Sequence, residues 1–260
     1  MAYLENNEKL LRKIADAFKE LEATVNSHAD VEVAPFSRAC SLVSPLIGCL
    51  GIAFKFAEMD YVAKVHDLAE ASKSIGTLQI MLDRDIKENR VRKVGSHTGN
   101  LLGVKRGLDL VKVLFEQILA AEFLDLGRGV LVIRKEFVNA VFELLYRIKN
   151  VLLVYNGLLV FKELEVRDKS SIFIVLRGDS LKDPASKAYA QVFAPHHGWA
   201  IRKAVAAGMY TLPTKARLLR KLNEDETSAR VQMQSYITTS APVILYIEKL
   251  YHSRERGIDR

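Results

Sequence analysis

The chain has 260 residues, of which 49% are hydrophobic and 27% are charged, and it carries a formal net charge of +7 at pH 7. With only 6 prolines and 14 glycines, this composition excludes a disordered or collagen-like chain and allows one or two buried cores. The positive charge suits nucleic acid, an anionic membrane surface or a phosphorylated ligand, and does not by itself choose among them.

Apolar residues recur every three to four positions along most of the chain, and no regular alternation of strands with helices competes with this pattern. The spacing therefore predicts an all-α protein. Pro45 is expected to kink the second helix. In chain order, helices are predicted over residues 11–25, 35–51, 54–76, 78–86 and 101–118. Two further helices are predicted to begin at 183 and 213, and the last one covers 231–250.

One segment, residues 123–177, differs from the rest of the chain. Apolar residues at helical spacing from 133 to 152 fit one helix, so the pattern leaves helix and strand open. Charged residues interrupt the segment too often for a membrane span. Runs rich in β-branched and aliphatic residues lie at 130–133, 151–154, 158–161 and 172–176.

The chain is expected to carry neither a secretory signal nor a membrane span. Its first residues lack a basic region followed by an apolar one. The most apolar stretch, residues 39–54, is interrupted by a proline and two glycines, so it is too short to span. Cys40 and Cys49 within it match neither a disulfide framework nor a metal-ligand spacing and are expected to be free thiols. These features predict a cytoplasmic protein.

Asp60 and Lys64 form the first candidate site. They are four residues apart in a predicted helix, so they lie on one face, one turn from each other. One interpretation is a solvated ion pair worth about 0.2–0.5 kcal/mol. The other is that a carboxylate and an ammonium beside the apolar stretch hold the polar end of an amphiphile. The spacing leaves both open.

The second candidate is the histidine pair His196 and His197, close to the single tryptophan, Trp199. Adjacent residues on a helix point about 100° apart, so both imidazoles would bind one metal ion poorly. The pair is either a helix start without a ligand or a place where one imidazole hydrogen-bonds a ligand. The sequence has no glycine-rich phosphate loop, CxxC, HExxH or GxSxG motif, so we expect no enzyme activity, metal or cofactor.

Three stretches together resemble the glycolipid transfer protein family: Asp60-x-x-x-Lys64, residues 92–108, and the run Phe-Ala-Pro-His-His-Gly-Trp at 193–199. The likeness is closest to the plant accelerated-cell-death branch, which transfers ceramide-1-phosphate, and it covers residues 8–122 and 178–260. It implies a two-layer helical sandwich that takes sphingolipid chains between its layers. It also implies a single domain, residues 1–260, with 123–177 as an insertion of uncertain structure.

The resemblance assigns roles to three residues of this chain. Asp60 would accept a hydrogen bond from the amide N–H of the ceramide, and His197 would donate one to the amide carbonyl. Lys64 would meet the phosphate. An amide in a dry pocket needs both bonds, because a buried polar group without a partner costs about 1–3 kcal/mol.

Two positions depart from the pattern. The phosphate-specific branch has arginines where this chain has Gly99 and Gly103, and sugar-binding members have a tryptophan at the first of these places. Arg106 lies on a similar helix face to Gly99 and is either a compensating cation or a solvated one. The headgroup is therefore expected to be held more weakly than in that branch.

The resemblance implies intermembrane transfer of a sphingolipid without chemical change, with ceramide-1-phosphate as the expected cargo. The expected partners are this lipid and, transiently, a membrane surface, and no nucleic acid is expected. The alternative is a transfer-deficient helical module that binds proteins or senses lipids. A lipid-modifying enzyme is disfavoured, because no spacing of a nucleophile and a base occurs.

Overall fold

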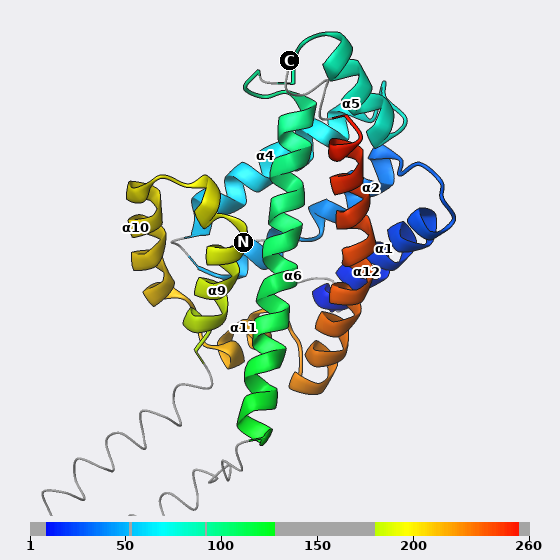
Figure 1. Ribbon diagram of the computed structural model, residues 1–260. Coiled ribbons are helices and arrows are strands. Elements are labelled where there is room, and N and C mark those ends of the chain that lie inside the picture. Colours follow the sequence, from blue (N-terminus) through cyan, green and yellow to red (C-terminus); the bar gives the residue numbers. More distant parts are fainter. Residues whose placement is uncertain (1–8, 52–53, 92, 128–179, 255–260) are drawn as a thin grey trace, which may run out of the picture. The chain divides into compact units, whose positions relative to one another are not determined.

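The computed structural model describes residues 9–51, 54–91, 93–127 and 180–254, with the side chains of 122–127 left out (Figure 1). The chain divides into a larger unit, residues 1–119 with 181–260, and a smaller one, residues 120–180. Most of the segment 123–177 lies outside the described residues, so its predicted insertion into a single domain stays a prediction.

The described chain is built from helices, which confirms the predicted all-α class. Short 3₁₀ turns, η2 (Ala194–His196) and η3 (Met209–Thr211), flank α10. The α-helices are α1 (Leu10–Asn26), α2 (Val33–Ser41), α3 (Ser44–Cys49), α4 (Lys55–Ala71), α5 (Leu78–Lys87), α6 (His97–Gly127), α9 (Lys182–Val192), α10 (Trp199–Gly208), α11 (Lys215–Lys221) and α12 (Glu226–His252).

The predicted helix at 35–51 is two helices in the structure. The chain breaks between α2 and α3 at Leu42 and Val43, and Pro45 lies in the first turn of α3. A proline is tolerated there because the first N–H groups of a helix have no intrahelical partner. The expected kink at Pro45 was therefore wrong. Similarly, α4 ends at Ala71 and does not reach Gly76.

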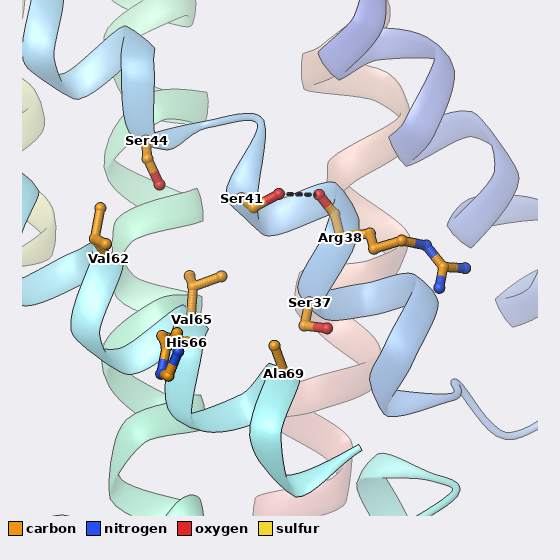
Figure 2. A pocket seen from close by; sticks show the side chains of 8 residues that line it. All are labelled: Ser37, Arg38, Ser41, Ser44, Val62, Val65, His66 and Ala69. Atoms are coloured by element: carbon orange, nitrogen blue, oxygen red, sulfur yellow. Dashed lines mark hydrogen bonds between the residues drawn. The ribbon is translucent and has the colours of Figure 1, made fainter. Parts of the chain in front are cut away.

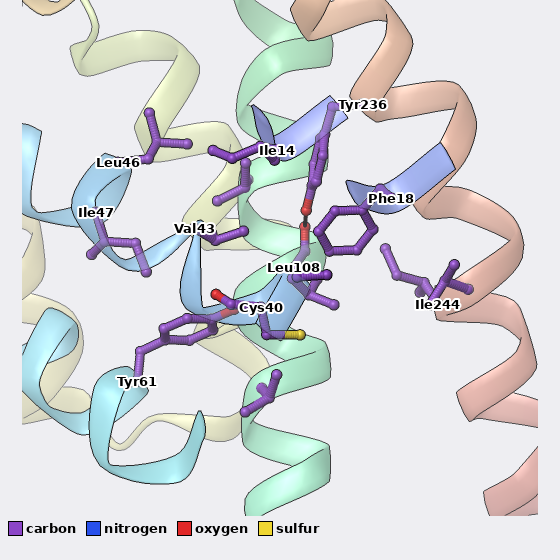
Figure 3. Close-up of a cluster of buried hydrophobic side chains, with 14 of the residues drawn as sticks. Ile14, Phe18, Cys40, Val43, Leu46, Ile47, Tyr61, Leu108, Tyr236 and Ile244 are labelled. Atoms are coloured by element: carbon purple, nitrogen blue, oxygen red, sulfur yellow. Dashed lines mark hydrogen bonds between the residues drawn. The ribbon is translucent and has the colours of Figure 1, made fainter. Parts of the chain in front are cut away.

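Tyr236 of α12 lies at the centre of the core and is 1% exposed (Figure 3). Its ring makes edge-to-face contacts with Phe18 of α1, with centroids 5.0 Å apart, and with Phe115 of α6, at 5.6 Å. Its hydroxyl donates to the Leu108 carbonyl at 3.2 Å, which satisfies the buried polar atom. One side chain thus ties α1, α6 and α12 together.

The beginning of α6 is held by neighbouring helices. The buried carboxylate of Asp85 in α5 accepts hydrogen bonds from the N–H and hydroxyl of Thr98, each at 2.8 Å. A carboxylate at a helix N-terminus also interacts favourably with the helix dipole. His97 Nδ1 lies 2.8 Å from a carboxylate oxygen of Asp67 in α4, and the Tyr251 hydroxyl of α12 donates to the Thr98 carbonyl. These contacts fix the beginning of α6 against α4, α5 and α12.

Candidate functional site

Asp60 and Lys64 of α4 form the ion pair that their spacing predicts, with the ammonium donating to the carboxylate. The side chain of Asp60 is 69% exposed, whereas that of Lys64 is 25% exposed. The aspartate is therefore within reach of a ligand, and the lysine is partly covered. The ion pair uses one carboxylate oxygen, so the other oxygen of Asp60 remains able to accept a hydrogen bond from a ligand.

Lys64 is covered because its aliphatic stem lies on the backbone of α6. A Cβ atom added at Gly103 would stand 2.5 Å from Lys64 Cδ and 2.6 Å from Cε. One turn further along, a Cβ at Gly107 would stand 2.5 Å from the ring of Tyr61. Two glycines on one face of α6 thus let two side chains of α4 lie directly on its backbone.

Gly99, the other position at which the resemblance expects an arginine, has a different environment. It is exposed, and the nearest atom to an added Cβ is Ser96 Oγ at 3.1 Å. Its N–H donates to that hydroxyl at 3.0 Å. A side chain at Gly99 would therefore need a small shift of the Ser96 hydroxyl, whereas one at Gly103 would displace Lys64.

Arg106 follows Gly103 on the same face of α6 and is half-buried. Within the described part of the chain it makes no hydrogen bond or ion pair. Its charge is the largest cause of the lowered pKa of His196. The adjacent Lys105 is engaged elsewhere, because it forms ion pairs with Asp109 at 2.8 Å and with Glu248.

His197 lies between η2 and α10 in an extended conformation, so the histidine pair does not start a helix. Its Nδ1 is 2.9 Å from the hydroxyl of Tyr189 in α9, and its ring stacks on Phe193 with centroids 5.5 Å apart. When Tyr189 donates to Nδ1, the ring proton is on Nε2, which no described residue contacts by a hydrogen bond. His197 can therefore donate Nε2–H to a carbonyl.

Tyr189 was not among the residues singled out from the sequence. It orients the imidazole and selects its tautomer, which is the role that hydrogen-bonded neighbours usually have for functional histidines. Only the chain reversal between α9 and η2 brings it to His197. No periodicity or motif could have indicated the contact.

A groove of about 280 Å³ lies on the other flank of α4 and does not include the candidate residues (Figure 2). It opens between α2 and α4, and the side chain of Arg38 points away from it. Its lining is formed by Ser37, Arg38, Ser41, Ser44, Val62, Val65, His66 and Ala69.

Within the described residues, no group of three or more histidine, cysteine, aspartate or glutamate side chains is placed to hold a metal ion. None of the helices described there combines the length and the apolar character that a membrane crossing requires.

Comparisons with known proteins identify a family that this chain resembles along most of its length. The model of the family described as glycolipid transfer protein matches residues 31–130 and 149–224. The chain is 53% identical over 254 residues to accelerated cell death 11 (ACD11) of Arabidopsis thaliana, with 97% of each protein covered. The matched ranges include part of the segment 123–177, so the boundaries of the predicted insertion also stay a prediction.

Solved structures show the same relationship. The crystal structure of the D60N mutant of Arabidopsis ACD11 complexed with C12 ceramide-1-phosphate matches at 51% identity and a TM-score of 0.74, covering 98% of this chain and 100% of that one. The apo-form of mouse ceramide-1-phosphate transfer protein matches at 16% identity and a TM-score of 0.64, covering 94% and 96%, and shows the fold alone. The predicted two-layer helical sandwich of this family is confirmed.

Proposed function

The chain belongs to the glycolipid transfer protein family, and from this premise we propose that it carries a sphingolipid between membranes without changing it chemically. Ceramide-1-phosphate is the expected cargo, since the D60N mutant of ACD11 was crystallised with that lipid. The observation that carries the proposal is the 53% identity to ACD11 over 97% of each protein. In the proposed site, Asp60 would accept a hydrogen bond from the lipid amide and His197 Nε2–H would donate one, while Lys64 and Arg106 would offer cations for a phosphate.

The proposed selectivity for ceramide-type lipids depends on hydrogen bonds to both the N–H and the carbonyl of the lipid amide in an apolar setting. An unpaired amide donor or acceptor costs about 1–3 kcal/mol when buried, so Asp60 and His197 together favour ceramide-type lipids. The lipid chains contribute about 0.8 kcal/mol per buried methylene, which supplies most of the affinity. No bond is made or broken, and in this proposal the protein is a carrier and not an enzyme.

A membrane surface is the second partner in this proposal, and α10 is the helix that would touch it. None of the residues of α10 is buried. Trp199 is 74% exposed and Ile201 is 51% exposed, and Arg202 and Lys203 follow directly. Tryptophan is enriched at membrane interfaces, and basic residues are attracted to anionic lipids. The proposed location is therefore cytoplasmic, with transient contact at membrane surfaces.

The alternative is a lipid-sensing or protein-binding module that no longer transfers lipid. Gly99 and Gly103 favour it, because this face of α6 lacks the two cations that the resemblance expects. A chain that captures a lipid weakly could report its presence without carrying it.

A vesicle assay with fluorescent ceramide-1-phosphate tests the proposal. Transfer from donor to acceptor vesicles is expected for the native chain, and native mass spectrometry should find intact lipid bound to it. Ile201→Ala should slow transfer without changing equilibrium binding. Ile80→Ala is the matched control, because Ile80 is 53% exposed on α5, and it should have no effect. Absence of both transfer and bound lipid would favour the alternative.

A further inference from the structure

His197 is held from two sides, and one of them is the helix that would touch the membrane. Tyr189 and Phe193 of α9 contact its ring. Its backbone carbonyl accepts a hydrogen bond at 2.8 Å from Nε of Arg202, which is exposed on α10. Building on the proposed function, we propose that Arg202 is a positioning residue that couples the amide donor His197 to membrane contact.

A single glycine joins His197 to α10. Gly198 has φ −65° and ψ 165°, an extended conformation that any residue can adopt, and apart from its chain neighbours no atom lies within 4 Å of an added Cβ. Neither the backbone angles nor the packing requires a glycine here. A glycine leaves the backbone free to change its conformation at this point. Without a further contact, α10 could therefore move while His197 stays in place.

Arg202 supplies that contact. Its side chain reaches back from the first turn of α10, across Gly198, to the carbonyl of His197. The hydrogen bond uses Nε–H, so the two Nη groups of the same exposed guanidinium remain able to meet a lipid phosphate. Arg202 can therefore contact a membrane and hold His197 at the same time.

The packing of α10 allows it to move. None of its residues is buried, so little packing opposes its displacement when the exposed side chains of Trp199 and Ile201 enter a bilayer. Because Arg202 holds the His197 carbonyl, His197 then moves with the helix, and its Nε2–H leaves the lipid amide. The lipid is thus held in solution and released where α10 touches a membrane.

Arg202→Met tests the inference, with Lys203→Met as the matched control. Each change removes one exposed cation from α10, but Lys203 makes no hydrogen bond or ion pair within the part of the chain that the structure describes. Both changes should weaken binding to phosphatidylserine vesicles by about fivefold. In the absence of vesicles, only Arg202→Met should weaken the binding of short-chain ceramide-1-phosphate, by about twofold to tenfold.

A second readout follows the imidazole of His197 directly, by NMR of the histidine-labelled protein. Adding phosphatidylserine bicelles should shift its signals in the native chain and in Lys203→Met, compared at equal fractions of bound protein. The shift should be smaller in Arg202→Met, because His197 no longer follows α10. A general loss of stability would not produce this difference between the two variants.

Arg202→Lys keeps the inference testable if Arg202→Met does not fold. A methylene carbon takes the place of Nε, so the charge on α10 remains while the donor to the His197 carbonyl is lost. Vesicle binding should stay unchanged, and the affinity for the lipid without vesicles should fall by about twofold to tenfold.

Equal lipid affinities and equal His197 shifts in the Arg202 variants and in Lys203→Met would overturn the inference and leave the proposed function standing. Failure of the native chain to bind the lipid would overturn both.

Discussion

Restoring the two missing arginines is the most informative perturbation of the headgroup site. The variant carries Gly99→Arg and Gly103→Arg together. The two positions are four residues apart in α6, so the new side chains would lie on one face about 6 Å apart along the helix. Both would stand beside Lys64, whose ammonium already meets that face.

The expected gain follows from the bonds that each guanidinium can make. A charge-assisted hydrogen bond to a phosphate contributes about 1.5–3 kcal/mol, so two contribute about 3–6 kcal/mol, or about 10²–10⁴ in affinity. Arginine at 99 meets only the Ser96 hydroxyl, which would have to shift slightly. Arginine at 103 displaces the Lys64 stem and weakens its pair with Asp60, which reduces the gain by at most about fivefold. Replacing glycine within a helix should also stabilise it by about 0.5–1 kcal/mol per site.

The assay is vesicle transfer of ceramide-1-phosphate by both proteins, with circular dichroism as the control for folding. The native chain should transfer weakly, and the double variant should transfer substantially faster at equal protein concentration. Gly99→Arg alone should recover part of the gain, since it requires no movement of Lys64. If the native chain already matches the double variant, another cation holds the phosphate and the reasoning about the two glycines is wrong.

Three further predictions concern single residues. Asp60→Val should weaken binding of ceramide-type lipids by about tenfold without unfolding, since the exposed carboxylate is an acceptor for the amide and supports no core contact; unchanged affinity in a binding titration would contradict this. Arg106→Gln should raise the pKa of His196 in an NMR titration, because the arginine charge is the main cause of its lowering. The hydrogen bond from Arg254 lowers the pKa of Asp83, so its stabilising effect is present above about pH 4 and is lost as the pH falls through the lowered value. Asp83→Asn should therefore reduce the dependence of the thermal midpoint on pH below about 4, and an unaltered acid profile would count against it.

The helices were predictable where one face of the chain is buried and the other is solvated. The buried residues of α1 recur at helical spacing, and the predicted range 11–25 agrees with α1 to within a residue. The break between α2 and α3 was missed because both sides of it are apolar. Val43 is fully buried there, so the hydrophobic pattern continues through the break. Similarly, the beginning of α6 depends on Asp85, a capping residue from another helix that local capping rules do not consider.

The site was predictable where its contacts are local and unpredictable where they cross the fold. Asp60 and Lys64 pair within one helix, so their spacing is sufficient. Lys105 and Arg106 are adjacent in sequence and looked equivalent. The structure separates them, because Lys105 is bound by Glu248 from α12, 143 positions away, whereas Arg106 makes no hydrogen bond or ion pair within the described residues. Which cation is available to a ligand is a property of tertiary packing.

The missing arginine at 103 and the flat conformation of Lys64 are one feature and not two. The stem of Lys64 occupies the space that any Cβ at position 103 would need. A chain with a side chain there holds its lysine off the backbone of α6, whereas in this chain the stem lies on Gly103 and the ammonium on Asp60. An arginine at 103 would add a fixed cation to the headgroup site. Without it, we expect the binding of a phosphate to depend on Lys64 and on Arg106.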